Sequence, residues 1–352
     1  MSKRALRRLG ALALGLFLPL LLLEVGIRAF QPAHAFLDRR RECFWILRLD
    51  EGLRESRMGK SRLEKDELLG WLPRPSISRE GETTNSKGMR GSREFPREKP
   101  PGVRRIAVLG DSFTYGLDVA DEETYCAQME DVTSGIEVLN FGVNGFGTDQ
   151  QYLYWKREAS RYAPDVVLLG FFLPDVERNV LSVRDLPKPR FVLEGDELRL
   201  IEVPALPMRE YVEGRVADCR STSRVLDLLD YLRRREAPTE SALEFQAKMR
   251  LGLAILERFQ AEVRAQGAFF AVVVIPHPLL FDDPDQGRLT RAIEACGARA
   301  GFPVLDLTPR LREEARARPD RELYGDSEHW TGAGHALAAE CILEFLRGQG
   351  VL

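Results

Sequence analysis

The sequence predicts an α/β protein built on a doubly wound parallel sheet, and two observations carry that prediction. Five short runs are rich in Val, Ile, Leu and Phe and apolar on both faces, as strands of a buried parallel sheet are. Helical patterns separate these runs, so strand and helix alternate. The runs cover residues 104–110, 136–142, 165–173, 268–276 and 302–307. In such a sheet, ligands bind at the carboxyl ends of the strands.

The first thirty residues differ from the rest. The basic head MSKRALRR precedes an apolar stretch that covers residues 9–27 and is interrupted by Glu24. A bilayer span needs about 20 apolar residues. Residues 1–30 therefore predict a transmembrane helix that anchors the chain or acts as an uncleaved signal. The alternative is a cleaved signal peptide, with residues 33–35 (Ala-His-Ala) as the cleavage site. Both predict export of the remainder, and export permits disulfides.

Three further regions follow along the chain. Residues 31–100 are polar and predict an irregular lead-in segment, and residues 101–352 form the main domain. The clearest helix covers residues 240–266. An insertion at about 180–238 holds a predicted hairpin, FVLEGDELRLIEV, and a short amphipathic helix, SRVLDLLDYLRRRE. We interpret this insertion as a lid over the crevice; the alternative is an extension that only packs against the domain.

Composition excludes several classes of function. A net charge of −3 leaves no basic footprint for nucleic acid. The five cysteines are widely spaced and form no C-x-x-C pair, which argues against a zinc ribbon or a thioredoxin-like motif. His329 and His335 are six positions apart, a spacing typical of no common zinc site. We therefore expect no metal, no cofactor and no nucleic-acid partner.

The stretch VLGDSFTYG, residues 108–116, places Ser112 where the first strand ends. Ser112 is either a nucleophile or only the N-cap of the following helix, a position that serine favours. Thr114 occupies the place of the second glycine in G-x-S-x-G, which excludes the nucleophile elbow of α/β-hydrolases. A serine hydroxyl also needs a neighbouring base to become a good nucleophile.

That base is predicted near the end of the chain, in YGDSEHWTGAGH, residues 324–335. Asp326 and His329 are three positions apart, so the carboxylate can hold one imidazole nitrogen while the other faces the serine. Alternatively, Asp326 caps the helix that begins near Thr331, and His329 is merely exposed. Between these two motifs along the chain, Gly145 follows the second strand. It either donates its N–H to an oxyanion together with the N–H of Ser112 or forms a plain turn.

Together, GDSFTYG, GVNG and DSEHW resemble the SGNH (GDSL-type) hydrolase family. The resemblance implies a flavodoxin-like three-layer α/β/α sandwich and a serine esterase or acyl-transfer chemistry. It also implies that Ser112 is the nucleophile and His329 the base. Asp326 would then orient His329, and Gly145 would donate to the oxyanion.

The likeness extends over nearly the whole chain to membrane-anchored bacterial members of that family. It rests on the segments LLLEVGIRAF, LLGWLPRP, NSKGMRG, DQQYLYW and YAPDVVLLGFFLPDVERN. This implies a single pass through the inner or cytoplasmic membrane, a lipid bilayer partner and an extracytoplasmic (periplasmic) catalytic domain. The expected substrate is an acyl ester, including an O-acetyl group on a carbohydrate.

The chain departs from the family pattern after the third strand. Family members carry an Asn-Asp pair there, and the asparagine side chain donates to the oxyanion, whereas this chain has Pro174-Asp175. Proline supplies no such donor. Asn179 and Asn144 are the candidates to replace it. Two alternative functions therefore stand beside the esterase: an acyltransferase that uses the same serine to modify an envelope glycan, and a carbohydrate-binding module with degenerate catalysis. A substrate contact or a rigid loop position is predicted for His277, and a structural role for His335.

Overall fold

The structure is a computed structural model that describes residues 3–37, 41–54, 62–234, 242–278, 281 and 284–352, with the side chains of 3–14 and 16 left out. The chain forms two compact units. The larger one comprises residues 61–182, 188–205 and 245–352, and the smaller one residues 1–60, 183–187 and 206–244.

A five-stranded sheet forms the centre of the larger unit, and all its described pairings are parallel. Its spatial order is β11-β10-β7-β5-β6, which in chain order is the 2-1-3-4-5 arrangement of flavodoxin-like folds. The strands are β5 (Arg104–Gly110), β6 (Ile136–Gly142), β7 (Val166–Phe172), β10 (Phe269–Ile275) and β11 (Val304–Asp306). The predicted five-stranded parallel sheet is confirmed, and the point where the strand order reverses lies between β5 and β7.

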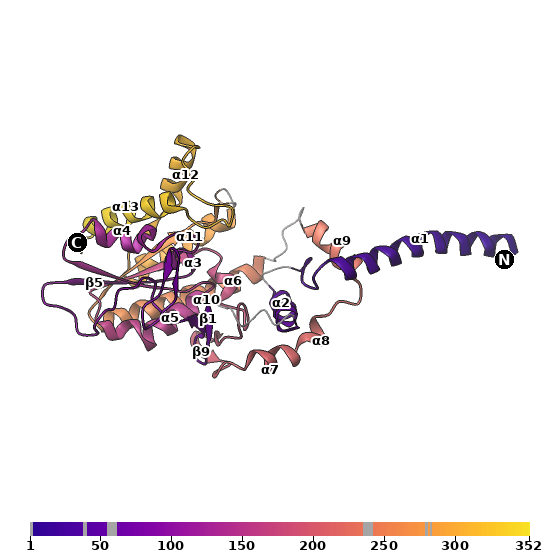
Figure 1. The fold of residues 1–352 in the computed structure, drawn as a ribbon, viewed down its shortest axis with the longest axis horizontal. Helices are drawn as coiled ribbons and strands as arrows, with labels where there is room; N and C mark the ends of the chain where they lie inside the picture. Colours follow the sequence, from indigo (N-terminus) through magenta and orange to yellow (C-terminus); the bar gives the residue numbers. More distant parts are fainter. Residues whose placement is uncertain (1–2, 38–40, 55–61, 235–241, 279–280, 282–283) are drawn as a thin grey trace. The chain divides into compact units, whose positions relative to one another are not determined.

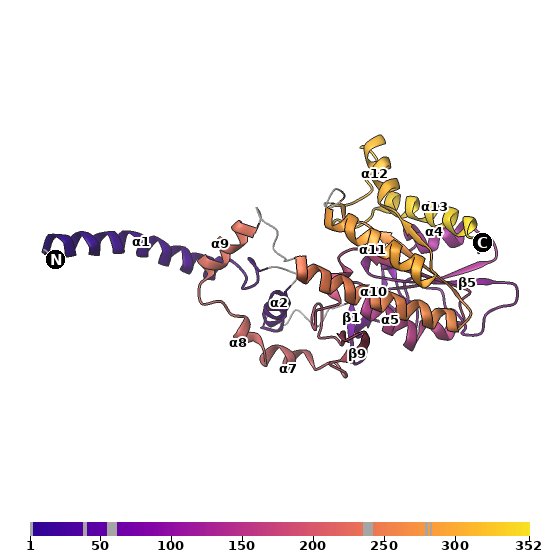
Figure 2. The same cartoon turned by 180° about the vertical axis from the view of Figure 1, so that it is seen from behind.

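Helices cover both faces of this sheet (Figures 1 and 2). On one face, α5 (Thr148–Arg157) lies beside α10 (Ala242–Ala265), where the rings of Trp155 and Phe259 are 6.1 Å apart. On the other, α4 (Tyr125–Asp131) packs with α13 (Gly332–Gly348) around a core that includes Met129 and Leu337. The remaining helices of this unit are α3 (Ser112–Tyr115), α6 (Asp175–Arg178), α11 (Pro284–Ala300), α12 (Thr308–Ala317) and the short 3₁₀ turns Asp121–Glu123 and Ala159–Tyr162.

The segment 31–100 is not irregular, so that prediction is wrong. It contains α2 (Glu42–Arg54) and two short antiparallel pairs, β1 (Leu63–Asp66) with β2 (Gly70–Pro73) and β3 (Ser78–Arg79) with β4 (Glu82–Thr83). The physical reason is a small number of apolar anchors in a polar stretch. Trp71 is fully buried, and its indole Nε1–H donates to the carbonyl of Asn144 at 2.9 Å.

The insertion at 180–238 does not form one element either. Its hairpin, β8 (Arg190–Glu194) and β9 (Glu197–Ile201), is confirmed and belongs to the larger unit. Residues 206–244 instead belong to the smaller unit and contain α7 (Met208–Glu213), α8 (Val216–Cys219) and α9 (Arg224–Arg234). Residues 235–238 lie outside the described residues. The interpretation of the insertion as a lid remains a prediction.

Covalent and polar contacts hold the smaller unit together. A disulfide joins Cys43 of α2 to Cys219 of α8. The carboxylate of Glu24, in α1 (Lys3–Phe30), accepts hydrogen bonds from the backbone N–H groups of Arg224 and Val225, each at 2.9 Å. The start of α9 is thereby fixed to the end of α1. Helices α1 and α2 therefore pack with a segment far along the chain, which no local sequence pattern indicates.

The predicted anchor lies on α1. In the part of the chain that the structure describes in full, no helix combines the length and the apolar character that crossing a bilayer requires. The side chains of residues 1–14 and 16, which belong to the predicted anchor (residues 1–30), lie outside that part.

Candidate active site

Ser112 is the first residue of α3, directly after β5, and is 5% exposed. The residue that caps this helix is its neighbour: the Asp111 carboxylate accepts a hydrogen bond from the N–H of Phe113 at 2.9 Å. The alternative role for Ser112, as the N-cap, is therefore already filled. Its hydroxyl remains available for other contacts at the carboxyl edge of the sheet.

His329 supplies the principal contact of that hydroxyl. The imidazole Nε2 of His329 lies 2.8 Å from the Oγ of Ser112, although the two residues are 217 positions apart. The Phe113 ring packs against the imidazole, with 5.2 Å between ring centroids. The structure thus brings the predicted serine and the predicted histidine into hydrogen-bonding geometry, and a base in contact with a hydroxyl can accept its proton.

The second imidazole nitrogen does not contact Asp326. The Nδ1 of His329 lies 3.2 Å from the Oγ of Ser327 and 3.9 Å from a carboxylate oxygen of Asp118. The described residues include both Asp326 and His329, and no hydrogen bond or ion pair joins them. Asp326 is instead exposed.

The cause lies in the loop before α13. Expecting Asp326 and His329 on one side assumed a helical turn, but residues 325–329 form a tight loop. The Gly325 N–H donates to the His329 carbonyl at 2.9 Å, and Glu328 has a positive φ of 66°. Asp326 lies inside this loop, between the two residues that close it.

Gly145 lies in the loop that follows β6 and is buried. Its φ of +81° falls in the left-handed region that glycine adopts without steric cost. Carbonyls on both sides of Gly145 are held in place. The Asn144 carbonyl accepts from Trp71, and the Phe146 carbonyl accepts from the guanidinium of Arg178 at 3.0 Å. The backbone around Gly145 is therefore fixed in position.

Arg178 was not predicted as a site residue, yet it links three loops of the site. Its Nη1 donates to the carboxylates of Asp111 at 2.7 Å and Asp175 at 2.8 Å, besides the Phe146 carbonyl. Both carboxylates are fully buried, so a cation between them offsets a large desolvation cost. The only signal in the sequence was an arginine about one helical turn after Pro174-Asp175, the pair at which this chain departs from the family pattern.

Neither asparagine considered as a substitute donor contacts Ser112 or His329 among the hydrogen bonds of the described residues. The Asn179 side-chain oxygen accepts from the backbone N–H of Asp149, at the start of α5, at 3.1 Å. The side-chain oxygen of Asn144 is buried, with no hydrogen-bond partner in the described structure. Pro174 itself directly precedes α6 with a φ of −65°.

The two remaining histidines of the main domain differ in their surroundings. His277 lies at the site: its Nε2 is 3.0 Å from a carboxylate oxygen of Glu328, the residue before His329. Burial lowers the pKa of His277, against the opposing effect of Glu328. His335 lies in the core, where its Nδ1 accepts from the N–H of Tyr125 at 3.2 Å, and burial lowers its pKa to about 3.

No group of three or more His, Cys, Asp or Glu side chains in the described structure is arranged to hold a metal ion.

The sequence family described as the GDSL-like lipase/acylhydrolase family matches residues 108–337, which include Ser112, Gly145, Asp326 and His329. No curated protein matches the chain.

Several solved structures are similar to this chain at low sequence identity. A lipase/acylhydrolase from Enterococcus faecalis is 15% identical over 70% of this chain and 97% of its own, with a TM-score of 0.43. A psychrotrophic esterase from Pseudoalteromonas sp. is 11% identical over 70% and 98%, with a TM-score of 0.43. A lipolytic G-D-S-L protein from Veillonella parvula is 13% identical over 69% and 97%, with a TM-score of 0.40.

Proposed function

Because the chain belongs to the GDSL-like lipase/acylhydrolase family and is an enzyme that acts on ester bonds, we propose that Ser112 is its nucleophile and His329 its general base. The observation that carries this proposal is the 2.8 Å distance between the Oγ of Ser112 and the Nε2 of His329. At this distance a proton can pass directly from the hydroxyl to the imidazole.

The reaction then has two halves. The Oγ of Ser112 attacks the ester carbonyl carbon while His329 takes the hydroxyl proton, and a tetrahedral oxyanion forms. The bond to the alcohol breaks as His329 returns the proton to the leaving oxygen, which leaves an acyl group on Ser112. A water molecule, deprotonated by His329, attacks this acyl group in the second half. The acid is released and the serine hydroxyl is restored.

The backbone N–H groups of Ser112 and Gly145 are the proposed donors to the oxyanion. Arg178 supports them as a positioning residue, since it joins Asp111, which precedes Ser112, to the carbonyl of Phe146, which follows Gly145. The asparagine donor of the family is absent at Pro174. We therefore assign this enzyme an oxyanion hole made of backbone groups.

Two carboxylates are proposed as the partner that orients His329. Asp326 has the sequence spacing, and Asp118 has the observed proximity, 3.9 Å from the Nδ1. Either would stabilise the imidazolium that forms during proton transfer.

An acyl ester is the proposed substrate, with an O-acetyl group on a carbohydrate as the specific form. The second candidate function is transfer of the same acyl group from Ser112 to a sugar hydroxyl in place of water. The carbohydrate-binding module with degenerate catalysis is the weaker alternative, because the Ser112–His329 contact is intact.

We also propose that residues 1–30 anchor the enzyme in the inner or cytoplasmic membrane, with the catalytic domain outside the cytoplasm. The apolar sequence supports this, as do the exposed apolar side chains between Phe17 and Val25 on α1. The Cys43–Cys219 disulfide supports export, because disulfides persist in oxidising compartments.

A fluorophosphonate probe, which reacts with an activated serine, tests the assignment. We expect the probe to label the wild type and a folded His335→Ala variant. We expect no labelling of Ser112→Ala or His329→Ala. Full labelling of His329→Ala would refute the proposed base. Release of free acid from an acyl ester, measured with and without a sugar acceptor, separates hydrolysis from transfer.

A further inference from the structure

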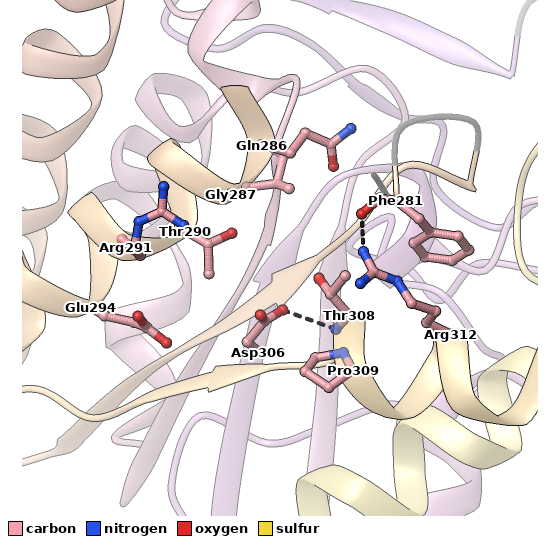
Figure 3. A pocket seen from close by; sticks show the side chains of 11 residues that line it. Phe281, Gln286, Gly287, Thr290, Arg291, Glu294, Asp306, Thr308, Pro309 and Arg312 are labelled. Atoms are coloured by element: carbon pink, nitrogen blue, oxygen red, sulfur yellow. Dashed lines mark hydrogen bonds between the residues drawn. The ribbon is translucent and has the colours of Figure 1, made fainter. Parts of the chain in front are cut away.

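A cavity of about 420 Å³ opens beside the carboxyl end of β11, between α11 and α12 (Figure 3). Pockets that bind small molecules measure about 300–1,000 Å³, so this one has the size of a small-ligand site. Four charged side chains and two uncharged ones matter for its chemistry: Arg291, Glu294, Asp306, Arg312, Phe281 and Gln286.

Three polar side chains of the cavity have no partner among the described residues. The Nε2 of Gln286 is buried without a hydrogen-bond partner, which costs free energy that a bound ligand can recover. Arg291 and Glu294 make no hydrogen bond or ion pair with any described residue, and both are exposed to solvent, so a ligand would replace the water that hydrates them. All three residues come from α11, so one wall of the cavity presents donors and an acceptor to a ligand.

The opposite wall is already fixed. One carboxylate oxygen of Asp306 accepts the N–H of Thr308 at 2.9 Å, and Arg312 donates to the carbonyl of Phe281 (Figure 3). A ligand would therefore meet a wall that is held in place, which lowers the ordering cost of binding.

The composition of the walls selects a class of ligand. The lining holds two arginines and two carboxylates, so the cavity has no excess of positive charge for an anion. Its walls are mixed, because the apolar side chains of Leu173, Phe281 and Pro309 alternate with charged and polar ones. A long acyl chain would remove water from those charged groups without offering them hydrogen bonds, which disfavours it. Carboxylates accept hydrogen bonds from hydroxyl groups, while guanidinium and amide N–H groups donate hydrogen bonds to hydroxyl oxygens. The ring of Phe281 offers an apolar face beside these polar groups. A neutral ligand with several hydroxyl groups, namely a sugar ring, matches this combination.

Two of the cavity residues connect it to the catalytic rim. Leu173 lines the cavity and follows Phe172, whose ring lies 4.8 Å from that of Phe113, the neighbour of Ser112. The ring of Phe281 lies 5.9 Å from that of Tyr324, which forms an antiparallel bridge with Trp330 next to His329.

We propose that this cavity binds a sugar ring of an acylated glycan and thereby directs an ester of that glycan to Ser112. The binding itself is independent of the catalytic assignment; the direction to Ser112 rests on the proposed function.

Calorimetric titration tests the binding without turnover. The Ser112→Ala enzyme is titrated with neutral xylo-, manno- and gluco-oligosaccharides. We expect saturable binding of at least one, weakened about ten-fold by Arg291→Gln or Glu294→Gln, because each removes a hydrogen bond to a charged group. Gly287→Leu should fill part of the cavity with its side chain. The helix should tolerate the change, because a Cβ at this position comes near only one atom, the Nη1 of Arg291 at 3.3 Å, at the end of a flexible side chain. Arg288→Gln, on the same helix but outside the lining, is the matched control.

The outcomes separate this proposal from the catalytic one. Absence of binding to every oligosaccharide overturns it, and so does binding that all three cavity variants leave unchanged. Turnover of nitrophenyl acetate, an ester without a sugar, reports on Ser112 alone and should be equal in wild type and the cavity variants. Selective loss of long-chain nitrophenyl esters in these variants would instead identify an acyl pocket and overturn the sugar assignment.

Discussion

The two nitrogens of His329 have unequal surroundings. Its Nε2 lies in hydrogen-bonding contact with Ser112, whereas its Nδ1 has a hydroxyl at 3.2 Å and the carboxylate of Asp118 at 3.9 Å. In a serine hydrolase a carboxylate on the far nitrogen fixes the tautomer and stabilises the imidazolium. Removing it has cost about 10⁴-fold in kcat in a well-studied protease. The carboxylate that fulfils this role can therefore be identified by the effect of its removal on kcat.

Asp118→Asn and Asp326→Asn form a matched pair for this test. If Asp118 closes on His329 during catalysis, Asp118→Asn should lower kcat by at least about 10²-fold and Asp326→Asn by much less. The opposite ranking would restore Asp326, with a loop that rearranges when substrate binds. Both residues are exposed on the surface, so thermal stability should be unchanged and serves as the control.

Pro174 offers a gain-of-function test at the same scale. Pro174→Asn should raise kcat by up to about 10²-fold by adding a side-chain donor to the oxyanion, with little change in KM. The native φ of −65° is open to asparagine, so the backbone need not move. A thermal melt identifies any loss of stability. An unchanged kcat in a folded variant would show that another group already fills the position.

Sequence reasoning singled out Ser112 and His329, which the structure brings into contact, because each lies in a short motif after a predicted strand. It could not locate Arg178 or Asp118. Their roles depend on contacts between loops after different strands, and a single charged residue in a loop carries no local signal. The misplacement of Asp326 has a similar cause, since the positive φ of Glu328 is not typical of that residue type.

At the scale of elements, α13 packs over the sheet and carries a buried histidine, His335, in its first turn. Burial, and to a smaller extent the positive charge of Arg90, lowers the pKa of His335 to about 3. An unfolded histidine titrates near 6.5, so below that pH the unfolded chain binds a proton that the folded chain rejects. Stability should therefore be unaffected above about pH 6.5 and fall as the pH decreases toward 3, by at most about 1.4 kcal/mol per pH unit.

His335→Gln isolates this effect. Glutamine keeps an acceptor for the N–H of Tyr125 but cannot take a proton. The free energy of unfolding in urea, measured between about pH 7 and about pH 4, should fall more steeply for the wild type than for the variant. Parallel curves would show that His335 does not contribute to acid sensitivity.

The strands were the most predictable elements. Each run that is apolar on both faces became a strand of the central sheet, and the boundaries of β5 and β6 agree with the predicted ranges. The helix α2 was missed even though Phe44, Trp45 and Leu47 are buried. Its apolar residues pack against a distant part of the chain, and a polar neighbourhood concealed them.

For the whole molecule, the amino terminus gives the main prediction. We expect the mature protein to keep residues 1–30 and to fractionate with membranes, because a basic head precedes an apolar stretch of nearly spanning length. Mass spectrometry of the purified native protein measures its first residue. A mature chain that starts at Phe36 would instead establish a cleaved signal peptide.

The smaller unit has a consequence for the order in which the chain becomes structured. Its stretches 1–60 and 206–244 leave the ribosome at different times, and Cys43 precedes its partner Cys219 by 176 residues. Until the second stretch emerges, α2 lacks the helices against which it packs. The amino-terminal region therefore cannot complete its packing until residues 206–244 have been synthesised, whereas the first strands of the sheet can already pair. A nascent chain arrested at residue 205 should leave the thiol of Cys43 open to alkylation, and the completed chain should protect it.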